Sequence, residues 1–423
     1  MDKIVIKGER PLKGKVKISG AKNSALPILF ASILTEGWNT FHNIPNLRDI
    51  QTTTQLLEFF GMKLKNGWIN HTGDFCVTAN GFHSHEAPYE LVRTMRASVL
   101  ALGPLLSRLG KAKVSLPGGC AIGARPINLH LKGLEQMGAK IEIEGGYVNA
   151  TAKKLHGARV NFDTVTVTGT ENLMMAATLA DGETILENAA QEPEVVDLAH
   201  ALIKMGARID GAGTKTIRIE GVPELRGVEH TVIPDRVEAA TFMMASAITG
   251  GNILIENTHS SDLESLIAKL TETGVKIRQE KEGLRVEGPK KLKAADITTA
   301  PFPGFATDFQ AQFMACMTVA EGNSTITETI FENRFMHALE MIRMGANIKI
   351  EGKTAIVSGT KKLSGAPVMA SDLRASAALI LAGLTADGIT EIHRVYHIDR
   401  GYEKIEKKLR KLGAKLKRVK VKY

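Results

Sequence analysis

Residues 134–143 read LEQMGAKIEI, which is typical of the last turn of a helix, a glycine and a short strand. The same arrangement occurs six times, at intervals of about 70 residues. Each glycine is predicted to adopt the left-handed conformation that ends a helix and reverses the chain into a strand. The six glycines are Gly61, Gly138, Gly206, Gly274, Gly345 and Gly413. The regular interval indicates six structural repeats of one kind.

A second glycine marks an earlier turn in every repeat. In five repeats the two glycines lie about 24 residues apart, but in the second repeat, from Gly110 to Gly138, they lie about 28 apart. The excess falls in residues 115–132, SLPGGCAIGARPINLHLK, where Cys120 lies among three glycines. A thiol on such a flexible arm predicts a catalytic loop. The alternative is a glycine-rich surface turn with an incidental thiol.

Six further segments are rich in Ala, Ser, Met and Gly on all sides, which predicts buried central helices. Their first turns carry Lys22, Arg96 and Arg374. Because a helix start already carries partial positive charge, these cations indicate an anionic ligand. Helix capping is a sufficient reason for Asp235 and Ser371. The predicted helices cover residues 20–34, 92–106, 168–180, 234–248, 306–320 and 371–384.

The composition, 43% hydrophobic and 23% charged in 423 residues, is that of a globular protein. The net charge of +9 comes entirely from residues 404–423, which favours a solvated basic face over a nucleic-acid interface. The three cysteines, Cys76, Cys120 and Cys316, have no metal-ligand or redox spacing. No apolar run reaches the roughly 18 residues that span a membrane, and the N-terminus lacks an apolar signal core. We therefore expect a soluble, cytoplasmic protein.

Several motifs, in order along the whole chain, resemble the enolpyruvyl transferases, and among them those that act on UDP-N-acetylglucosamine in peptidoglycan synthesis. The resemblance implies an α/β fold, an inside-out α/β barrel, in which two pseudo-symmetric domains each hold three βαβαββ repeats around buried helices. It implies domains at 22–233 and at 1–21 with 234–423. The motifs are SGAKNSALPIL, TMRAS, LPGGCAIGARP, TGTENLMMAA, TDFQAQFMA, FENRF, SDLRASAALILAGL and HIDRGYE.

The resemblance also implies the roles of individual residues. Cys120 would be the proton donor and Asp308 the group at the reacting sugar hydroxyl, while Lys22 and Arg400 complete the catalytic set. The reaction needs phosphoenolpyruvate and UDP-N-acetylglucosamine, with no metal and no cofactor. The implied substrate-binding residues are Lys22, Asn23, Arg96, Arg125, Pro126, Ile127, Asn128, Leu129, Asp308, Ile330, Arg334, Asp372, Arg374 and Arg400.

Two other functions stay open at this point. One is the sister reaction, which transfers the same enolpyruvyl group to shikimate 3-phosphate. The other is a non-catalytic, repeat-built clamp that binds nucleic acid through the basic tail. The repeats and the charge fit a clamp, but a clamp does not explain Cys120 or the longer second repeat.

Overall fold

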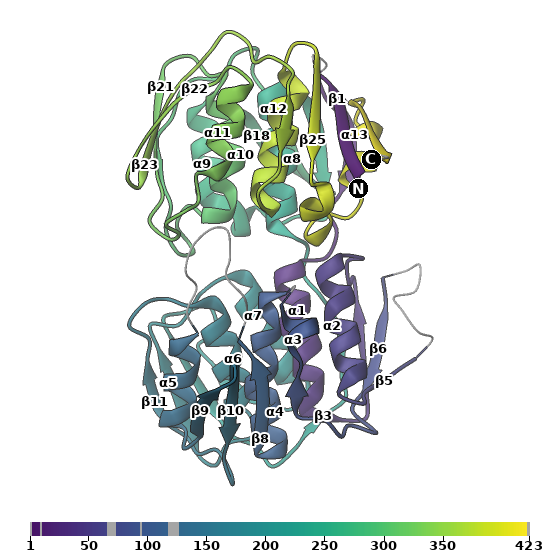
Figure 1. Cartoon of the computed structure of the whole chain (residues 1–423), viewed down its shortest axis with the longest axis vertical. Helices are drawn as coiled ribbons and strands as arrows, with labels where there is room; N and C mark the ends of the chain where they lie inside the picture. Colours follow the sequence, from purple (N-terminus) through teal and green to yellow (C-terminus); the bar gives the residue numbers. More distant parts are fainter. Residues whose placement is uncertain (1, 9–10, 66–72, 94, 117–126, 421–423) are drawn as a thin grey trace. The chain divides into compact units, whose positions relative to one another are not determined.

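The computed structural model describes residues 2–8, 11–65, 73–93, 95–116 and 127–420 (Figure 1). These residues form two compact units. The first unit comprises the described residues between Gly20 and Ile233. The second unit comprises the described residues up to Ser19 and those from Pro234 onwards. The chain therefore passes from one unit to the other at 19–20 and again at 233–234.

Each unit holds three four-stranded sheets of one pattern, in which a parallel pair is extended by two antiparallel strands. In hydrogen-bonded order, the first unit has β16 (Glu229–Thr231), β4 (Trp38–His42), β6 (Phe75–Thr78) and β5 (Lys63–Leu64); β7 (Glu86–Ala87), β8 (Lys111–Ser115), β10 (Tyr147–Thr151) and β9 (Lys140–Glu144); and β11 (Arg159–Asn161), β12 (Glu183–Glu187), β14 (Thr216–Glu220) and β13 (Arg208–Asp210). The short strands β3 (Thr35–Glu36) and β15 (Leu225–Arg226) pair separately in parallel.

The second unit repeats the pattern with strands taken from both ends of the described chain. Its sheets are β2 (Lys13–Lys17), β17 (Asn252–Glu256), β19 (Gly283–Glu287) and β18 (Lys276–Glu280); β20 (Ile297–Thr298), β21 (Asn323–Thr327), β23 (Thr354–Ser358) and β22 (Asn347–Glu351); and β24 (Pro367–Met369), β25 (Ile389–His393), β1 (Asp2–Lys7) and β26 (Lys415–Lys420). In the third sheet β1 lies between β25 and β26, and Ile4 is opposite both Ile392 and Arg418.

Buried helices occupy the middle of each unit, as predicted. In the second unit α8, α10 and α12 pack on one another, and Figure 1 shows them between the strands β21 to β23 on one side and β25 and β1 on the other. The central helices are α1 (Lys22–Ala31), α4 (Leu102–Leu109) and α6 (Val167–Ala177) in the first unit, and α8 (Arg236–Thr249), α10 (Thr307–Met317) and α12 (Leu373–Thr385) in the second. Outer helices are α2 (Arg48–Phe59), α5 (Asn128–Gln136), α7 (Pro193–Lys204), α9 (Glu264–Glu272), α11 (Met336–Arg343) and α13 (Ile405–Lys411).

The repeats predicted from glycine spacing are confirmed. All six helix-end glycines have φ between 87° and 109°, where a side chain would be strained. Five repeats run strand, central helix, strand, outer helix and two strands. In the sixth repeat β26 alone follows α13, and β1 from the beginning of the chain takes the place of the last strand, so the βαβαββ architecture is also confirmed. Short helices complete the fold: η1 (Ser32–Leu34), α3 (Tyr89–Val92), η2 (Arg96–Ala101), η3 (Ser260–Leu263) and η4 (Val395–Arg400).

One predicted helix is wrong in its form. Residues 92–106 are not a single α-helix, because α3 ends at Val92 and the 3₁₀-helix η2 precedes α4. Pro104 supplies a physical reason for a new start at Leu102: it is the third residue of α4, and in the first turn of a helix its missing N–H costs no intrahelical hydrogen bond. The apolar burial of the segment is nevertheless as expected, and Leu102 and Leu105 are fully buried.

Within the described part of the chain, no helix has both the length and the apolar character needed to cross a membrane.

Candidate active site

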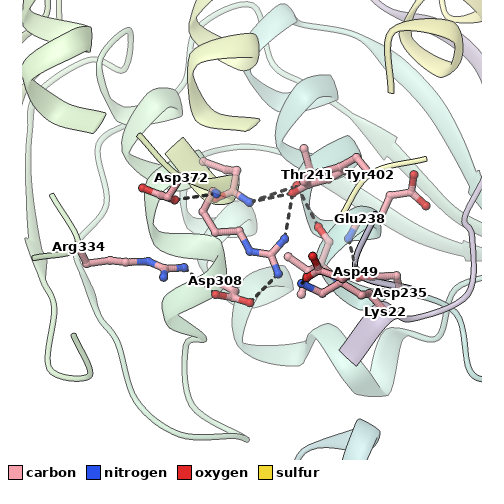
Figure 2. A network of polar contacts seen from close by, with 12 residues as sticks. Lys22, Asp49, Asp235, Glu238, Thr241, Asp308, Arg334, Asp372 and Tyr402 are labelled. Carbon is pink, nitrogen blue, oxygen red and sulfur yellow. Dashed lines mark hydrogen bonds and ion pairs between the residues drawn. The ribbon is translucent and has the colours of Figure 1, made fainter. Parts of the chain in front are cut away.

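The starts of α10 and α12 meet at a carboxylate, Asp308, in the second unit (Figure 2). Arg334 Nη2 donates to Asp308 Oδ1 at 2.6 Å, and Arg374 Nη2 donates to Asp308 Oδ2 at 2.6 Å. The two arginine side chains are nearly buried, whereas the Asp308 side chain remains 28% exposed. The structure thus brings together a partly exposed carboxylate and two fixed guanidinium groups, all three implied by the family resemblance.

Arg374 stays charged although it is buried. Burial disfavours the charged guanidinium, but the nearby Asp308 carboxylate outweighs that penalty, so the pKa of Arg374 lies above its usual value. Asp372 caps α12 by accepting from the backbone N–H groups of Arg374 at 2.9 Å and Ala375 at 3.0 Å. The predicted cap at Ser371 is therefore wrong: its hydroxyl instead donates to Asp372 Oδ2, because the longer carboxylate reaches two N–H groups at once.

Asp372 itself enters the site as an anion. Burial opposes its ionisation, but the hydrogen bond from Ala375 and the positive charge of Arg334 together hold its pKa below the ordinary value. A second negative charge therefore lies near the arginines, beside that of Asp308. This cluster of alternating charges lies at helix starts, as the sequence pattern indicated.

A buried tyrosine, Tyr402, supports the cluster from within the unit. Its hydroxyl is 2.7 Å from Thr241 Oγ1 of α8 and 3.4 Å from Gln312 Nε2 of α10, and Arg374 Nη1 lies 3.5 Å away (Figure 2). Burial raises the pKa of this phenol, so the hydroxyl keeps its proton. One hydrogen-bonded group thereby links all three central helices of this unit. Tyr402 lies within the motif HIDRGYE, but the sequence did not single it out.

A second residue that the sequence did not reveal is Glu328, which is 1% exposed. Its Oε1 accepts from the backbone N–H groups of Ile330 at 2.8 Å and Phe331 at 3.2 Å, and its Oε2 accepts from Thr307 Oγ1 at 2.8 Å. Glu328 therefore joins the turn that carries Ile330 to the start of α10. Ile330 is 37% exposed, which leaves it available to a ligand near Asp308.

Lys22 and Asn23 are the first two residues of α1 in the first unit. Lys22 Nζ lies 3.4 Å from Asp49 Oδ2 of α2, and both side chains are largely buried. The ammonium group is thus held in one direction by a carboxylate on the neighbouring helix. This matches the expectation of a cation at a helix start.

Arg96 begins η2, and its charge acts on the buried His130 of α5. The ring of His130 is 2.9 Å from Asn172 Nδ2 and 3.2 Å from Thr168 Oγ1, both on α6. Burial, with a further contribution from Arg96, lowers the pKa of His130 to about 3, so the ring is neutral. Ile127 is the N-cap residue of α5, followed by the exposed Asn128 and the half-buried Leu129.

The neutral state of His130 predicts a pH dependence of stability. The unfolded chain takes up a proton near pH 6.5, whereas the folded protein does so only near pH 3. Acidification through this window therefore destabilises the fold, by about 1.4 kcal/mol per pH unit below pH 6. Between pH 6.5 and 5 we expect the free energy of unfolding to fall by about 2 kcal/mol more than in His130→Gln. Urea denaturation measures this free energy at each pH, and His200→Gln, on an exposed site, is the control. If the free energy of unfolding changed with pH by the same amount in the wild type and in both variants, His130 would not be the neutral group that we infer.

Three predicted site residues, Cys120, Arg125 and Pro126, lie outside the described residues. Arg400 ends η4, which packs against α12. The other two cysteines have structural surroundings. Cys316 is fully buried in α10, with Sγ 3.6 Å from the carbonyl oxygen of Met244, and burial raises the pKa of its thiol. Cys76 lies in β6, 3.6 Å from Thr40 Oγ1.

A cavity of about 790 Å³ opens at the opposite ends of α8, α10 and α12. Its lining includes Thr249, Lys290, Lys361 and Thr385, and none of the predicted site residues. The chemistry at the helix starts is therefore separate from this cavity. Among the residues that the structure describes, no group of three His, Cys, Asp or Glu side chains could hold a metal ion.

Comparison with known proteins agrees with this arrangement. A family model described as EPSP synthase (3-phosphoshikimate 1-carboxyvinyltransferase) matches residues 6–409. The chain is 60% identical over 420 residues, 99% of its length and all of the relative's, to UDP-N-acetylglucosamine 1-carboxyvinyltransferase of Geotalea daltonii. It is 61% identical over 421 residues, 99% and 100% of the two chains, to the protein of the same name from Geobacter metallireducens.

The solved structures agree with the sequence relatives. The enolpyruvyl transferase NikO from Streptomyces tendae superposes with a TM-score of 0.89 at 26% identity, over 99% of both chains. The fold implied by the sequence motifs is thus confirmed. The chain belongs to the enolpyruvyl transferase family, which includes EPSP synthase and the UDP-N-acetylglucosamine 1-carboxyvinyltransferases.

Proposed function

We propose that this protein transfers the enolpyruvyl group of phosphoenolpyruvate to the 3-hydroxyl of UDP-N-acetylglucosamine and releases phosphate. The observation that carries the proposal is the identity of about 60% over the full length to relatives that bear the name of this activity. Asp308 supports it, because a partly exposed carboxylate fixed by two arginines can take the proton of a sugar hydroxyl. The reaction would belong to cytoplasmic peptidoglycan synthesis.

The cations of the proposed site have a chemical role in this proposal. Phosphoenolpyruvate brings a phosphate and a carboxylate, and its phosphate leaves with additional charge. Fixed cations that meet this developing charge stabilise the transition state without reorganisation. Lys22, Asn23, Arg125 and Arg400 would bind phosphoenolpyruvate, while Arg96 and residues 125–129 would contact the nucleotide sugar.

Asp308 is suited to act on the sugar hydroxyl. Its two oxygens accept from Arg334 and Arg374, which favour the ionised form. Each carboxylate oxygen can accept a further hydrogen bond, and the side chain is 28% exposed, so the arginines leave room for a hydroxyl donor. The carboxylate would take the hydroxyl proton as the oxygen attacks. Ile330 and Asp372 would line the same substrate.

The chemical steps balance as an addition and an elimination. The sugar oxygen bonds to the central carbon of phosphoenolpyruvate while the double-bond electrons take a proton from Cys120 at the methylene carbon. A tetrahedral intermediate results. The methyl group then loses a proton to the Cys120 thiolate formed in the first step, and the electrons of that C–H bond re-form the double bond. The C–O bond to phosphate breaks with its electron pair on the departing phosphate, and Asp308 releases its proton to solvent. Positioned acids and bases of this kind typically contribute about a hundred- to ten-thousandfold in rate.

The sister reaction with shikimate 3-phosphate is the second candidate, because the family model bears its name. Phosphate release from phosphoenolpyruvate distinguishes the two. We expect release with UDP-N-acetylglucosamine, and none above background with shikimate 3-phosphate or without an acceptor. Release only with shikimate 3-phosphate would overturn the proposal in favour of the sister reaction, and no release with either would remove both. The proposed domains, 22–233 and 1–21 with 234–423, are part of the same proposal.

We predict that the epoxide fosfomycin labels Cys120 and neither of the other cysteines. Cys316 is buried and its thiol keeps its proton, while Cys76 lies within β6 without a neighbouring cation in its described contacts. Intact mass should show one adduct, and peptide mapping should place it at Cys120. Cys120→Ala is the control and should take up none. Labelling of Cys316 in the native enzyme would contradict the assignment.

A further inference from the structure

A buried carboxylate on α7 lies outside every role assigned above. Asp197 is 3% exposed, and its two oxygens serve three donors. Oδ2 accepts from Ser24 Oγ and from the backbone N–H of Ile233 at 3.2 Å, and Oδ1 lies 2.9 Å from His230 Nε2. A buried carboxylate costs several kcal/mol unless such donors compensate it. The three contacts are therefore what makes an acid tolerable at this depth.

The three donors come from segments that are distant in sequence. Ser24 lies in the first turn of α1, two residues after Lys22. His230 belongs to β16, and Ile233 is the last residue of the first unit. Ala21 N–H also donates to the Ile233 carbonyl at 2.7 Å, so the two ends of the first unit are paired directly. Asp197 ties this pair of chain ends to α7.

The start of α1 has particular need of such support. Its N-cap residue, Ala21, has no side-chain oxygen and makes no capping hydrogen bond. The first turn of a helix lacks intrahelical partners for its N–H groups, so an uncapped start is easily displaced. Here the Ser24 hydroxyl anchors the first turn laterally to Asp197 instead. The backbone of Lys22 lies in the same turn as this anchor, and Asp49 contacts its ammonium group.

We propose that Asp197 is a positioning residue that holds Lys22 in place through Ser24 and Ile233. The inference rests on the proposed function in one respect, the assignment of Lys22 to phosphoenolpyruvate. Asp197 itself touches no substrate. Its loss should therefore raise the KM for phosphoenolpyruvate more than the KM for UDP-N-acetylglucosamine.

The first test is Asp197→Asn, which keeps the shape of the side chain and replaces one acceptor oxygen by a donor. We expect the KM for phosphoenolpyruvate to rise about tenfold, the KM for the sugar nucleotide to change less than about twofold, and Ser24→Ala to shift both in the same direction but less. Leu202→Val, a buried change on the same helix, is the control for lost stability alone and should leave the two KM values in their normal ratio. An unchanged KM for phosphoenolpyruvate in Asp197→Asn would overturn the proposal. If that variant does not fold, Ser24→Ala decides, because it leaves the other two donors of Asp197 intact.

A double-mutant cycle with Lys22→Arg tests whether the effect passes through Lys22. We expect Asp197→Asn to change kcat/KM for phosphoenolpyruvate much less in the Lys22→Arg background than in the wild type. Fully multiplicative effects would overturn the positioning role. If Lys22→Arg alone leaves the KM for phosphoenolpyruvate unchanged, the proposed role of Lys22 fails as well. If Lys22→Arg raises that KM and Asp197→Asn does not, only the present inference fails.

Discussion

Asp308→Asn should lower turnover by at least about a hundredfold while UDP-N-acetylglucosamine still binds. Asparagine has the size of aspartate but cannot take up the hydroxyl proton. Its amide can still accept from one of the two arginines that hold Asp308, so the helix starts should stay together. Steady-state kinetics and calorimetric titration with the sugar nucleotide measure the two effects separately.

Two further variants distinguish the loss of the proton acceptor from a change in the geometry around Asp308. Asp387→Asn removes an exposed carboxylate paired with Lys362 and should have normal turnover. Arg334→Lys keeps Asp308 and a positive charge but loses the planar fork of the guanidinium group. If Arg334→Lys lost as much turnover as Asp308→Asn, a disturbed position of residue 308 rather than the loss of proton transfer would explain both losses. Near-normal turnover in Asp308→Asn would exclude the base role outright.

Cys120→Ala should lose about a hundred- to ten-thousandfold in turnover, because the methylene carbon of phosphoenolpyruvate then lacks its acid. Cys120→Asp should retain transfer well above the alanine variant, since a carboxylic acid can supply the same proton, and it should resist the epoxide. Phosphate release by the two variants is the measurement.

The other thiols provide the control for this comparison. Cys76→Ala removes a half-buried thiol from β6 and should leave turnover unchanged. If Cys120→Ala and Cys76→Ala both turned over at the wild-type rate, the acid would have to be another group. A Cys120→Asp variant no better than Cys120→Ala would show that the thiol does more than deliver a proton.

The repeated fold could be predicted because each repeat ends its outer helix with the same local device. A glycine at positive φ is a property of a few adjacent residues, and Gly206 and Gly345 both show it. The pairing of β1 between β25 and β26 could not be predicted in this way. It joins Ile4 to Ile392 and Arg418, and no local pattern in MDKIVIK specifies partners so far along the chain. Only the family resemblance suggested where this strand belongs.

The candidate site divides in the same way. Arg374 was recognisable because a charge at the start of an otherwise apolar helix stands out, and Asp308 because it lies in the family motif TDFQAQFMA. Glu328 and Asp197 were not, since they lie at an ordinary strand end and in an amphipathic helix, and Tyr402 was not singled out within the motif HIDRGYE. Each acquires its role from partners distant in sequence. Their burial, 3% or less, is a product of tertiary packing. The residues proposed to contact substrate have a local signature in the sequence, whereas the residues proposed to position them do not.

The position of the first unit within the chain has a consequence for synthesis on the ribosome. Its two ends, Ala21 and Ile233, meet in a single hydrogen bond of 2.7 Å, so every strand and helix of this unit has been translated when residue 233 emerges. The second unit cannot close so early, because β1, made first, pairs with β26, made last. Both edges of nascent β1 therefore stay without their partner strands while about 400 residues are added at roughly 5–20 residues per second. The order of synthesis thus allows the first unit to fold while the second is still incomplete. Until β25 and β26 are made, the unpaired edges of β1 are open to aggregation and need protection during translation.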